Sequence, residues 1–127
     1  MHRALRLRSS ADFDKLRQSG RRWHHPMILL IVGPNDLEQS RFGFSASRRF
    51  GNAASRNRIK RILREVVRSH LVAIENGWDC LFVARLAANG ATYSEIEAAV
   101  NQLLKRSKLL TPFSDLRESK KFEEGLT

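Results

Sequence analysis

The sequence predicts an α+β fold, in which helices pack on a small mixed β-sheet as a two-layer α/β sandwich. Segments 55–70 and 92 onward carry apolar residues at helical spacing. Segments 26–32, 41–47 and 78–85 have the continuous or alternating apolar residues of strands. With 127 residues, 42% of them hydrophobic, the chain has room for one domain with one modest core.

The N-terminal part predicts a basic arm followed by a short helix. Residues 1–9 are basic and lack a clear hydrophobic period. Ser9 or Ser10 can cap a helix whose opening turn contains Asp12 and Asp14, acidic residues that suit the positive end of the helix dipole. Gly20 is a natural end for this helix.

Three segments predict strands with different surroundings. Residues 26–32 are continuously apolar, which indicates a central strand covered on both faces. Residues 41–47 alternate, so one face is apolar and the other is small and polar, and a ligand could approach the polar face closely. Residues 78–85 form the third strand, which contains the single cysteine, Cys80; we expect Cys80 to pack as a small hydrophobe.

A strongly basic helix is predicted from Ser55, its expected N-cap, to His70. Its apolar stripe consists of Ile59, Ile62, Leu63, Val66 and Val67. The opposite side carries Asn57, Lys60, Arg61, Arg64 and Arg68, flanked by Arg56 and Arg58. A cation near a helix N-terminus costs about 0.3 to 1 kcal/mol, so this cluster requires a compensating partner, for which phosphates are the obvious candidate.

The positive charge is concentrated on one part of the chain. From Arg41 to Arg68 there are nine Arg or Lys residues against one acid, Glu65, a local net charge of +8 within a total of +10. A solvated surface helix normally mixes charges in supportive pairs four residues apart, and this one does not. Together with a pI near 11.0, the clustering favours nucleic acid as the partner.

The last helix begins near Thr92, with Glu95 three residues later in the pattern of a capping box. Its apolar stripe consists of Ile96, Ala99, Val100, Leu103 and Leu104. Residues 111–127 are polar and without periodicity, so we expect a mobile tail after a domain that spans residues 1–110.

Composition and motifs exclude several classes of function. No segment approaches the length of a membrane span and no secretion signal opens the chain, so we expect a cytoplasmic protein without a membrane partner. Asp12 and Asp14 fall on different sides of a helix, and His24 and His25 would point to opposite faces of an extended segment. We therefore expect no catalytic residue and no metal ligand in the chain itself.

Two linked motifs resemble the protein subunit of bacterial ribonuclease P. They are Gly43–Ala53, with the sequence GFSASRRFGNA, and Arg56–Arg61, with the sequence RNRIKR. Further similarities extend the resemblance over about residues 5–110. They are Arg6-Leu7-Arg8, Asp12-Phe13, the apolar strand near residue 30, and Trp78-Asp79 through Ala84-Arg85. The resemblance implies a four-stranded mixed sheet in the order helix-strand-strand-strand-helix-strand-helix, with the basic helix in an unusual left-handed crossover.

The resemblance also implies a function. Proteins of this family join a large catalytic RNA in a 1:1 complex that removes the 5′ leader of precursor tRNA. The RNA performs the hydrolysis with bound magnesium, the protein alone is inactive, and the protein improves substrate affinity and metal use. The positions that match the contact with the RNA subunit are Arg48, Arg49, Arg56, Asn57, Arg58, Lys60, Arg61, Arg64 and Arg68.

A cleft between the first helix and the sheet holds the single-stranded leader in the family. The matching positions are Phe13, Arg17, Ile28, Leu30, Arg41 and Ser45. Arg17 and Leu30 stand where the family often has aromatic residues. Base stacking on an aromatic ring contributes about 1 to 3 kcal/mol per base, so we expect leader binding here to depend more on charge and less on stacking.

Two other interpretations fit the charge pattern. A noncatalytic protein that binds structured RNA, for example in ribosome assembly, would use the same basic helix but would not stimulate precursor tRNA cleavage. A DNA-binding protein would place the helix in a major groove, yet the sequence offers no convincing helix-turn-helix partner and no dimer seam.

Overall fold

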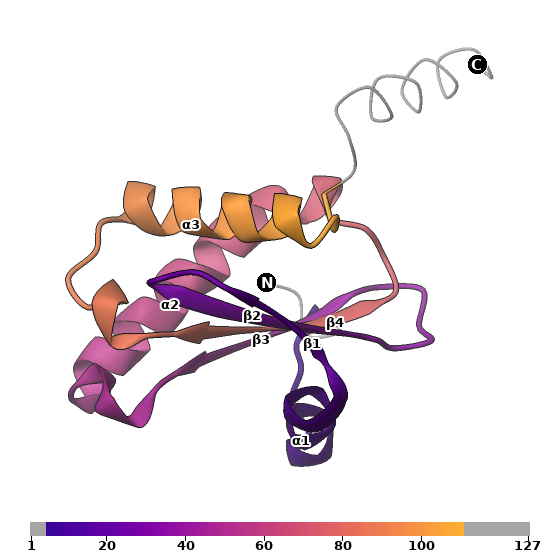
Figure 1. Ribbon diagram of the computed structural model, residues 1–127, viewed down its shortest axis with the longest axis horizontal. Coiled ribbons are helices and arrows are strands. Elements are labelled where there is room, and N and C mark those ends of the chain that lie inside the picture. Colours follow the sequence, from indigo (N-terminus) through magenta and orange to yellow (C-terminus); the bar gives the residue numbers. More distant parts are fainter. Residues whose placement is uncertain (1–4, 111–127) are drawn as a thin grey trace, which may run out of the picture.

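The computed structural model describes residues 5–110, which form a four-stranded sheet and three α-helices (Figure 1). The α-helices are α1 (Ser10–Ser19), α2 (Ala53–His70) and α3 (Tyr93–Arg106). The strands are β1 (Arg21–His24), β2 (Ile28–Pro34), β3 (Arg41–Ala46) and β4 (Trp78–Ala84). Short 3-10 helices are η2 (Arg48–Phe50), η3 (Leu71–Ala73) and η4 (Leu86–Ala88). The α+β class and the element order are confirmed; the expected tail at 111–127 lies outside the described residues.

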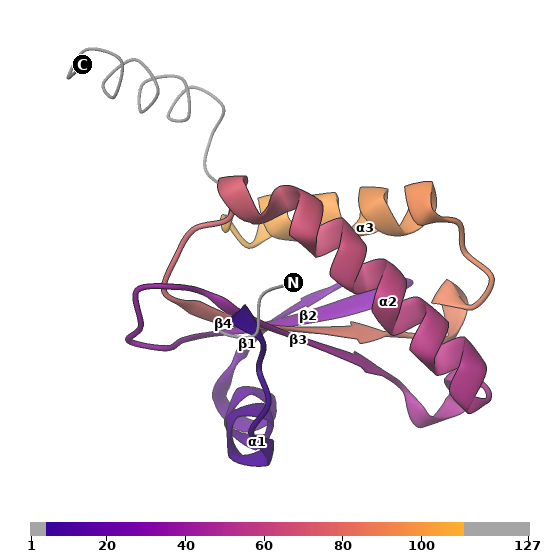
Figure 2. The same cartoon turned by 180° about the vertical axis from the view of Figure 1, so that it is seen from behind.

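The sheet has the strand order β1-β2-β4-β3 and is mixed. β2 pairs antiparallel with β1 and with β4, whereas β3 pairs parallel with β4. Because β3 and β4 are parallel neighbours, the chain must cross from one end of the sheet to the other between them, and α2 makes this crossing (Figures 1 and 2). Figures 1 and 2 show the sheet nearly edge-on, with α2 above it. For an observer who looks from α2 onto the sheet with the parallel strands β3 and β4 pointing upward, β4 lies to the left of β3, so the crossover is left-handed.

The helices cover both faces of the sheet, which corrects the expected two-layer sandwich. Figure 1 shows α2 and α3 on one face and α1 on the other. The main core joins α2 and α3 to the sheet, and a smaller cluster joins α1 to the opposite face. That smaller cluster consists of Leu7, Leu16, Ile31 and Leu81. A strand that is apolar at every position needs cover on both sides, so the continuous run in β2 is the physical reason for the additional layer.

Two local features differ from the sequence-based expectations. β1 is a short strand at the edge of the sheet, and its residues, Arg21–His24, are mostly exposed. They do not alternate between apolar and polar, so the sequence has no strand pattern there. α2 begins at Ala53, two residues before the expected cap, because the Asn52 side chain accepts a hydrogen bond from the Ser55 N–H at 2.9 Å. The predicted capping box of α3, formed by Thr92 and Glu95, is confirmed.

The single cysteine of the chain lies in the core. Cys80 is fully buried in the main cluster, as expected of a small hydrophobe, and burial raises the pKa of its thiol. Within residues 5–110, no helix is both long and apolar enough to span a membrane.

Candidate nucleic-acid interface

The cationic face of α2 is produced by the way this helix packs. Ile59, Leu63, Val66 and Val67 are fully buried against the sheet and α3, which directs the remaining side chains outward. The exposed members of the predicted RNA-binding set are Arg48, Arg49, Asn57, Arg58, Arg61 and Arg68, and the half-buried ones are Arg56, Lys60 and Arg64. All nine therefore lie on α2 or on the η2 turn before it.

Most of this positive charge has no acidic partner in the described part of the chain. Among residues 5–110, Arg68 forms the one ion pair in the set, to Glu65 at 2.8 Å, and both side chains are about half exposed. Arg58 Nη2 donates a long hydrogen bond of 3.4 Å to the Ala91 carbonyl, which leaves its charge uncompensated. The face can therefore neutralise an external polyanion without first breaking internal ion pairs.

The turn before α2 holds two further arginines in a fixed place. Phe50 is 1% exposed and anchors η2 in the core, and its carbonyl accepts a hydrogen bond of 3.3 Å from Asn89 Nδ2. The Phe50 N–H donates to the Ser47 carbonyl at 3.0 Å. Arg48 and Arg49 are exposed on this anchored turn, so they extend the cationic face beyond the N-terminus of α2.

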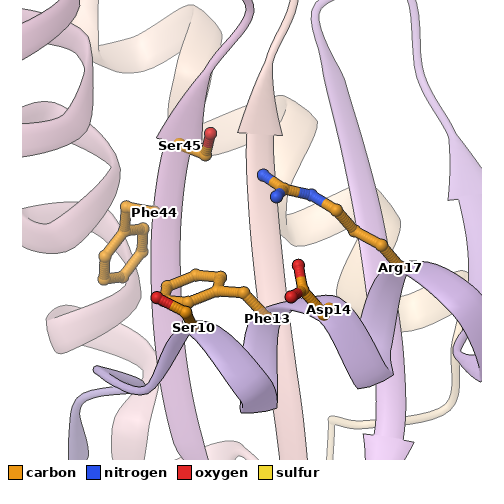
Figure 3. A pocket seen from close by; sticks show the side chains of 6 residues that line it. All are labelled: Ser10, Phe13, Asp14, Arg17, Phe44 and Ser45. Carbon is orange, nitrogen blue, oxygen red and sulfur yellow. The ribbon is translucent and has the colours of Figure 1, made fainter.

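A pocket of about 300 Å³ lies between α1 and β3 on the other face of the sheet (Figure 3). It is lined by Ser10, Phe13, Asp14, Arg17, Phe44 and Ser45. The structure therefore brings together three of the predicted leader-binding residues, Phe13, Arg17 and Ser45. α1 can approach β3 closely because Gly43 has no side chain. A Cβ atom at this position would lie 2.7 Å from Phe13 Cε1.

Three residues of this pocket were missing from the sequence-based set. Ser10 and Asp14 come from α1, and Phe44 comes from β3. The spacing of Ser10, Phe13, Asp14 and Arg17 places them along one side of a helix, and this signal could have identified Ser10 and Asp14. Phe44 was assigned to the apolar face of its strand, and no pattern in the sequence showed that its ring would also border the pocket.

Ile28 and Leu30 do not reach this pocket, which corrects their assignment as leader-binding residues. Both side chains are completely buried in the main core, on the face of the sheet that α2 and α3 cover. The alternate positions Leu29 and Ile31 belong to the cluster under α1. Because successive side chains of a strand point to opposite faces, Ile28 and Leu30 face away from α1.

Arg41 also lies outside the pocket, and its guanidinium is occupied by two carboxylates. Nε and Nη2 donate to the two oxygens of Asp79 at 2.9 and 2.7 Å, and Nη1 lies 3.3 Å from Asp12 Oδ2. These bonds raise the pKa of Arg41 further. Asn35 Nδ2 donates a third bond to Asp79, at 3.0 Å. Arg41 borders a second cavity of about 370 Å³ and links α1 to the end of β4.

The described residues do not form a metal centre of their own. Within residues 5–110, no group of three or more His, Cys, Asp or Glu side chains converges to hold an ion. The carboxylates of Asp12 and Asp79 are instead used by Arg41.

The fold and the charge distribution define a class of protein: an α+β protein with a strongly basic crossover helix, a feature typical of proteins that bind nucleic acid. The chain matches the ribonuclease P family over residues 1–108, and it belongs to that family. Relatives support the assignment along most of the chain. The ribonuclease P protein component of Herpetosiphon aurantiacus is 38% identical over 109 residues, which cover 86% of this chain and 89% of the relative. That of Roseiflexus sp. strain RS-1 is 40% identical over 111 residues, with coverage of 87% and 91%.

Solved structures of the family share the fold. The ribonuclease P protein of Staphylococcus aureus superimposes with a TM-score of 0.79 at 29% identity, covering 86% of this chain and 100% of that one. The protein of Thermotoga maritima gives a TM-score of 0.74 at 28% identity, covering 80% and 96%. The protein is therefore a subunit of the ribonucleoprotein enzyme that matures the 5′ end of tRNA.

Proposed function

We propose that the cationic face of α2, together with η2, binds the catalytic RNA of ribonuclease P in a 1:1 complex. The observation that carries this proposal is the uncompensated charge of that face, in which only Arg68 is ion-paired among the described residues. Arginine suits bidentate contacts with phosphate, and Lys60 supplies a point charge. Asn57 is exposed and can both donate and accept, so it can bind a base edge or a 2′-hydroxyl group.

We propose that the pocket between α1 and β3 receives the single-stranded 5′ leader of precursor tRNA. Phe13 offers one aromatic ring and Arg17 one guanidinium, both of which can stack on an unpaired base. Ser10 and Ser45 supply hydroxyl groups at the two sides of the pocket. Ile28, Leu30 and Arg41 are left out of this proposal for the reasons given above.

The hydrolysis itself is assigned to the RNA subunit. We propose that the magnesium used in this reaction is held mainly by the RNA subunit and the substrate, as the family resemblance implies. The protein can nevertheless reduce the magnesium requirement, because its cations lower the repulsion between the phosphates of the catalytic RNA and those of the substrate. This role places the protein with precursor tRNA in the cytoplasm, and residues 1–110 are the unit proposed to carry it.

The test is removal of the 5′ leader from a precursor tRNA at low magnesium. Three reactions are compared: the protein alone, a bacterial ribonuclease P RNA alone, and the two together. The proposal predicts cleavage in the mixture and none with the protein alone. High magnesium serves as the control, because it should restore cleavage by the RNA alone if the RNA is correctly folded.

A different result would favour the noncatalytic alternative. If the protein binds ribonuclease P RNA no more tightly than other structured RNAs of equal length and adds no cleavage, it acts on another RNA. Preference for duplex DNA over structured RNA in the same titration would instead indicate a DNA-binding protein.

A further inference from the structure

We propose that Arg64 is a stacking platform for an unpaired nucleobase of the 5′ leader, whereas the other cations of α2 contact phosphates. This inference rests on the proposed function. The packing of Arg64 differs from that of its neighbours on the helix in three respects. Its guanidinium lies over an aromatic ring, its Nε atom is inaccessible to solvent, and the ring beneath it borders the leader pocket.

The aromatic partner belongs to a column of side chains that begins in the core. Phe82 on β4 is fully buried, and its ring stacks on Phe44 of β3 with centroids 5.9 Å apart and planes 16° apart. The guanidinium carbon of Arg64 lies 5.8 Å from the centroid of the Phe44 ring. Phe44 therefore contacts Phe82 within the sheet and Arg64 on the helix, and the column holds the guanidinium in place.

The Nε atom of Arg64 is closed to phosphate. It has no measurable solvent exposure and no hydrogen-bond partner within the described residues. A bidentate contact through Nε and one Nη atom is therefore blocked, although this is one of the ways in which arginine binds a phosphate. The side chain as a whole is only half-buried, so the rest of the guanidinium group stays accessible.

The location connects the two proposed RNA surfaces. Arg64 projects from the cationic face of α2, and the ring beneath it, Phe44, borders the leader pocket next to Ser45 (Figure 3). A single strand that leaves the pocket toward the RNA subunit on α2 therefore passes this guanidinium. Guanidinium planes stack on nucleobases in single-stranded RNA recognition, which identifies the ligand as an unpaired base.

The decisive variant is Arg64→Lys, because lysine keeps the charge and loses the plane. The holoenzyme is assembled with each protein, and its Kd is measured for a precursor tRNA and for the matching mature tRNA over a range of salt. We expect Arg64→Lys to weaken precursor binding by about tenfold, the effect of losing one stacked base. Mature tRNA affinity and the salt slope should stay unchanged, because the exchange keeps the positive charge.

The matched control is Arg21→Lys on β1, which replaces an arginine whose guanidinium carbon also lies over an aromatic ring, 5.5 Å from the centroid of Trp23, but away from both proposed RNA surfaces. Loss of the guanidinium plane at that place should leave the Kd within about twofold of the wild-type value. Unchanged thermal unfolding of both variants shows that packing is intact. Equal effects of the two exchanges, or no effect of Arg64→Lys, would overturn the proposal in favour of a simple charge contact.

A second measurement tests the base directly. Precursor tRNAs whose leaders carry a single abasic position are bound to the wild-type and the Arg64→Lys holoenzymes. When the abasic position is the one that contacts residue 64, the two holoenzymes should bind the precursor equally well. If the effect persists for every abasic leader, the stacking claim is wrong. If Arg64→Lys weakens binding to the RNA subunit alone, the base belongs to that RNA and the leader assignment is wrong. Failure of the wild-type protein to form a holoenzyme would instead reject the proposed function.

Discussion

At the scale of single residues, the neighbours of an arginine decide what it can do. Arg41 and Arg61 have the same chemistry, but Arg41 is held by Asp79 and Asp12, whereas Arg61 is exposed without an acidic partner in the described chain. Asp79 is 7% exposed, so its charge depends on Arg41 and on the amide of Asn35. Arg41 therefore acts in the stability of the fold and in the placement of α1.

The exchange Asp79→Asn should lower the free energy of unfolding by about 2 kcal/mol. Loss of one partner from a buried pair typically costs more, about 3 to 5 kcal/mol, but the Arg41 side chain is 24% exposed and water can partly solvate it. Urea unfolding measures the change. The control is Glu65→Gln, which breaks an exposed pair and should cost less than about 0.5 kcal/mol. Equal effects of the two exchanges would contradict the structural role of Asp79.

The errors made from the sequence at this scale have a common physical origin. The run that contains Ile28 and Leu30 is apolar at every position, so it lacks the alternation that would show which side chains face α1. The partner of Arg41 lies 38 residues away along the chain, and only the parallel pairing of β3 with β4 brings them together. By contrast, the structure places Phe13, Arg17 and Ser45 in one pocket, and their contact with the leader stays a prediction.

At the scale of the elements, amphipathic helices are the features that the sequence predicts best. α2 ends at the predicted His70, and α3 begins directly after its predicted cap, Thr92, because their buried stripes are regular. β1 has no such signal, since it has only four residues and lies at an edge of the sheet. The position of β1 is set by its antiparallel pairing with β2, and a local sequence pattern contains no information about this pairing.

The basic face of α2 should control the salt dependence of RNA binding. Arg61→Ala removes one cation, so the slope of log K against log salt for the RNA subunit should become shallower by roughly one unit if one phosphate contact is lost. Lys105→Ala on α3 removes the same charge elsewhere on the surface and should leave the slope unchanged. A filter-binding titration at several salt concentrations measures both. The same slope for Arg61→Ala and wild type would rule out this contact.

The approach of α1 to β3 depends on the small residue between them. In the Gly43→Ala variant the new Cβ would lie 2.7 Å from the ring of Phe13 and 3.3 Å from the Cβ of Leu7, so the ring or the helix must move. We expect a loss of about 1 to 3 kcal/mol of stability by overpacking, together with weaker binding of precursor tRNA. Affinity for the RNA subunit should not change, because α2 lies on the other face.

A second exchange checks the cause of this effect. Phe13→Leu shortens the side chain that the new methyl group would meet, so Gly43→Ala should cost less stability in a Phe13→Leu background than in the wild type. Urea unfolding of the four proteins gives the coupling energy. A coupling near zero would show that Phe13 does not cause the effect of the exchange.

At the scale of the whole molecule, the sheet separates a large core from a small one. The sequence predicted the mixed α+β class and the central strand, but it did not show that α1 would cover the face opposite to α2 and α3. Helical periodicity identifies which side of a helix is buried and does not identify the face of the sheet that receives it. Here the result places the proposed leader pocket and the cationic face on different sides of β3.

This division predicts that α1 is the least stable of the three helices. Leu16 is the single buried residue of α1, whereas four are buried in α2 and five in α3. Native-state hydrogen exchange should therefore show α1 opening at a lower free energy than α2 and α3, which should exchange close to global unfolding. A single-stranded RNA that binds the pocket should slow exchange in α1 selectively, because binding stabilises the closed form. Equal protection of all three helices would mean that the small cluster under α1 is as cooperative as the main core.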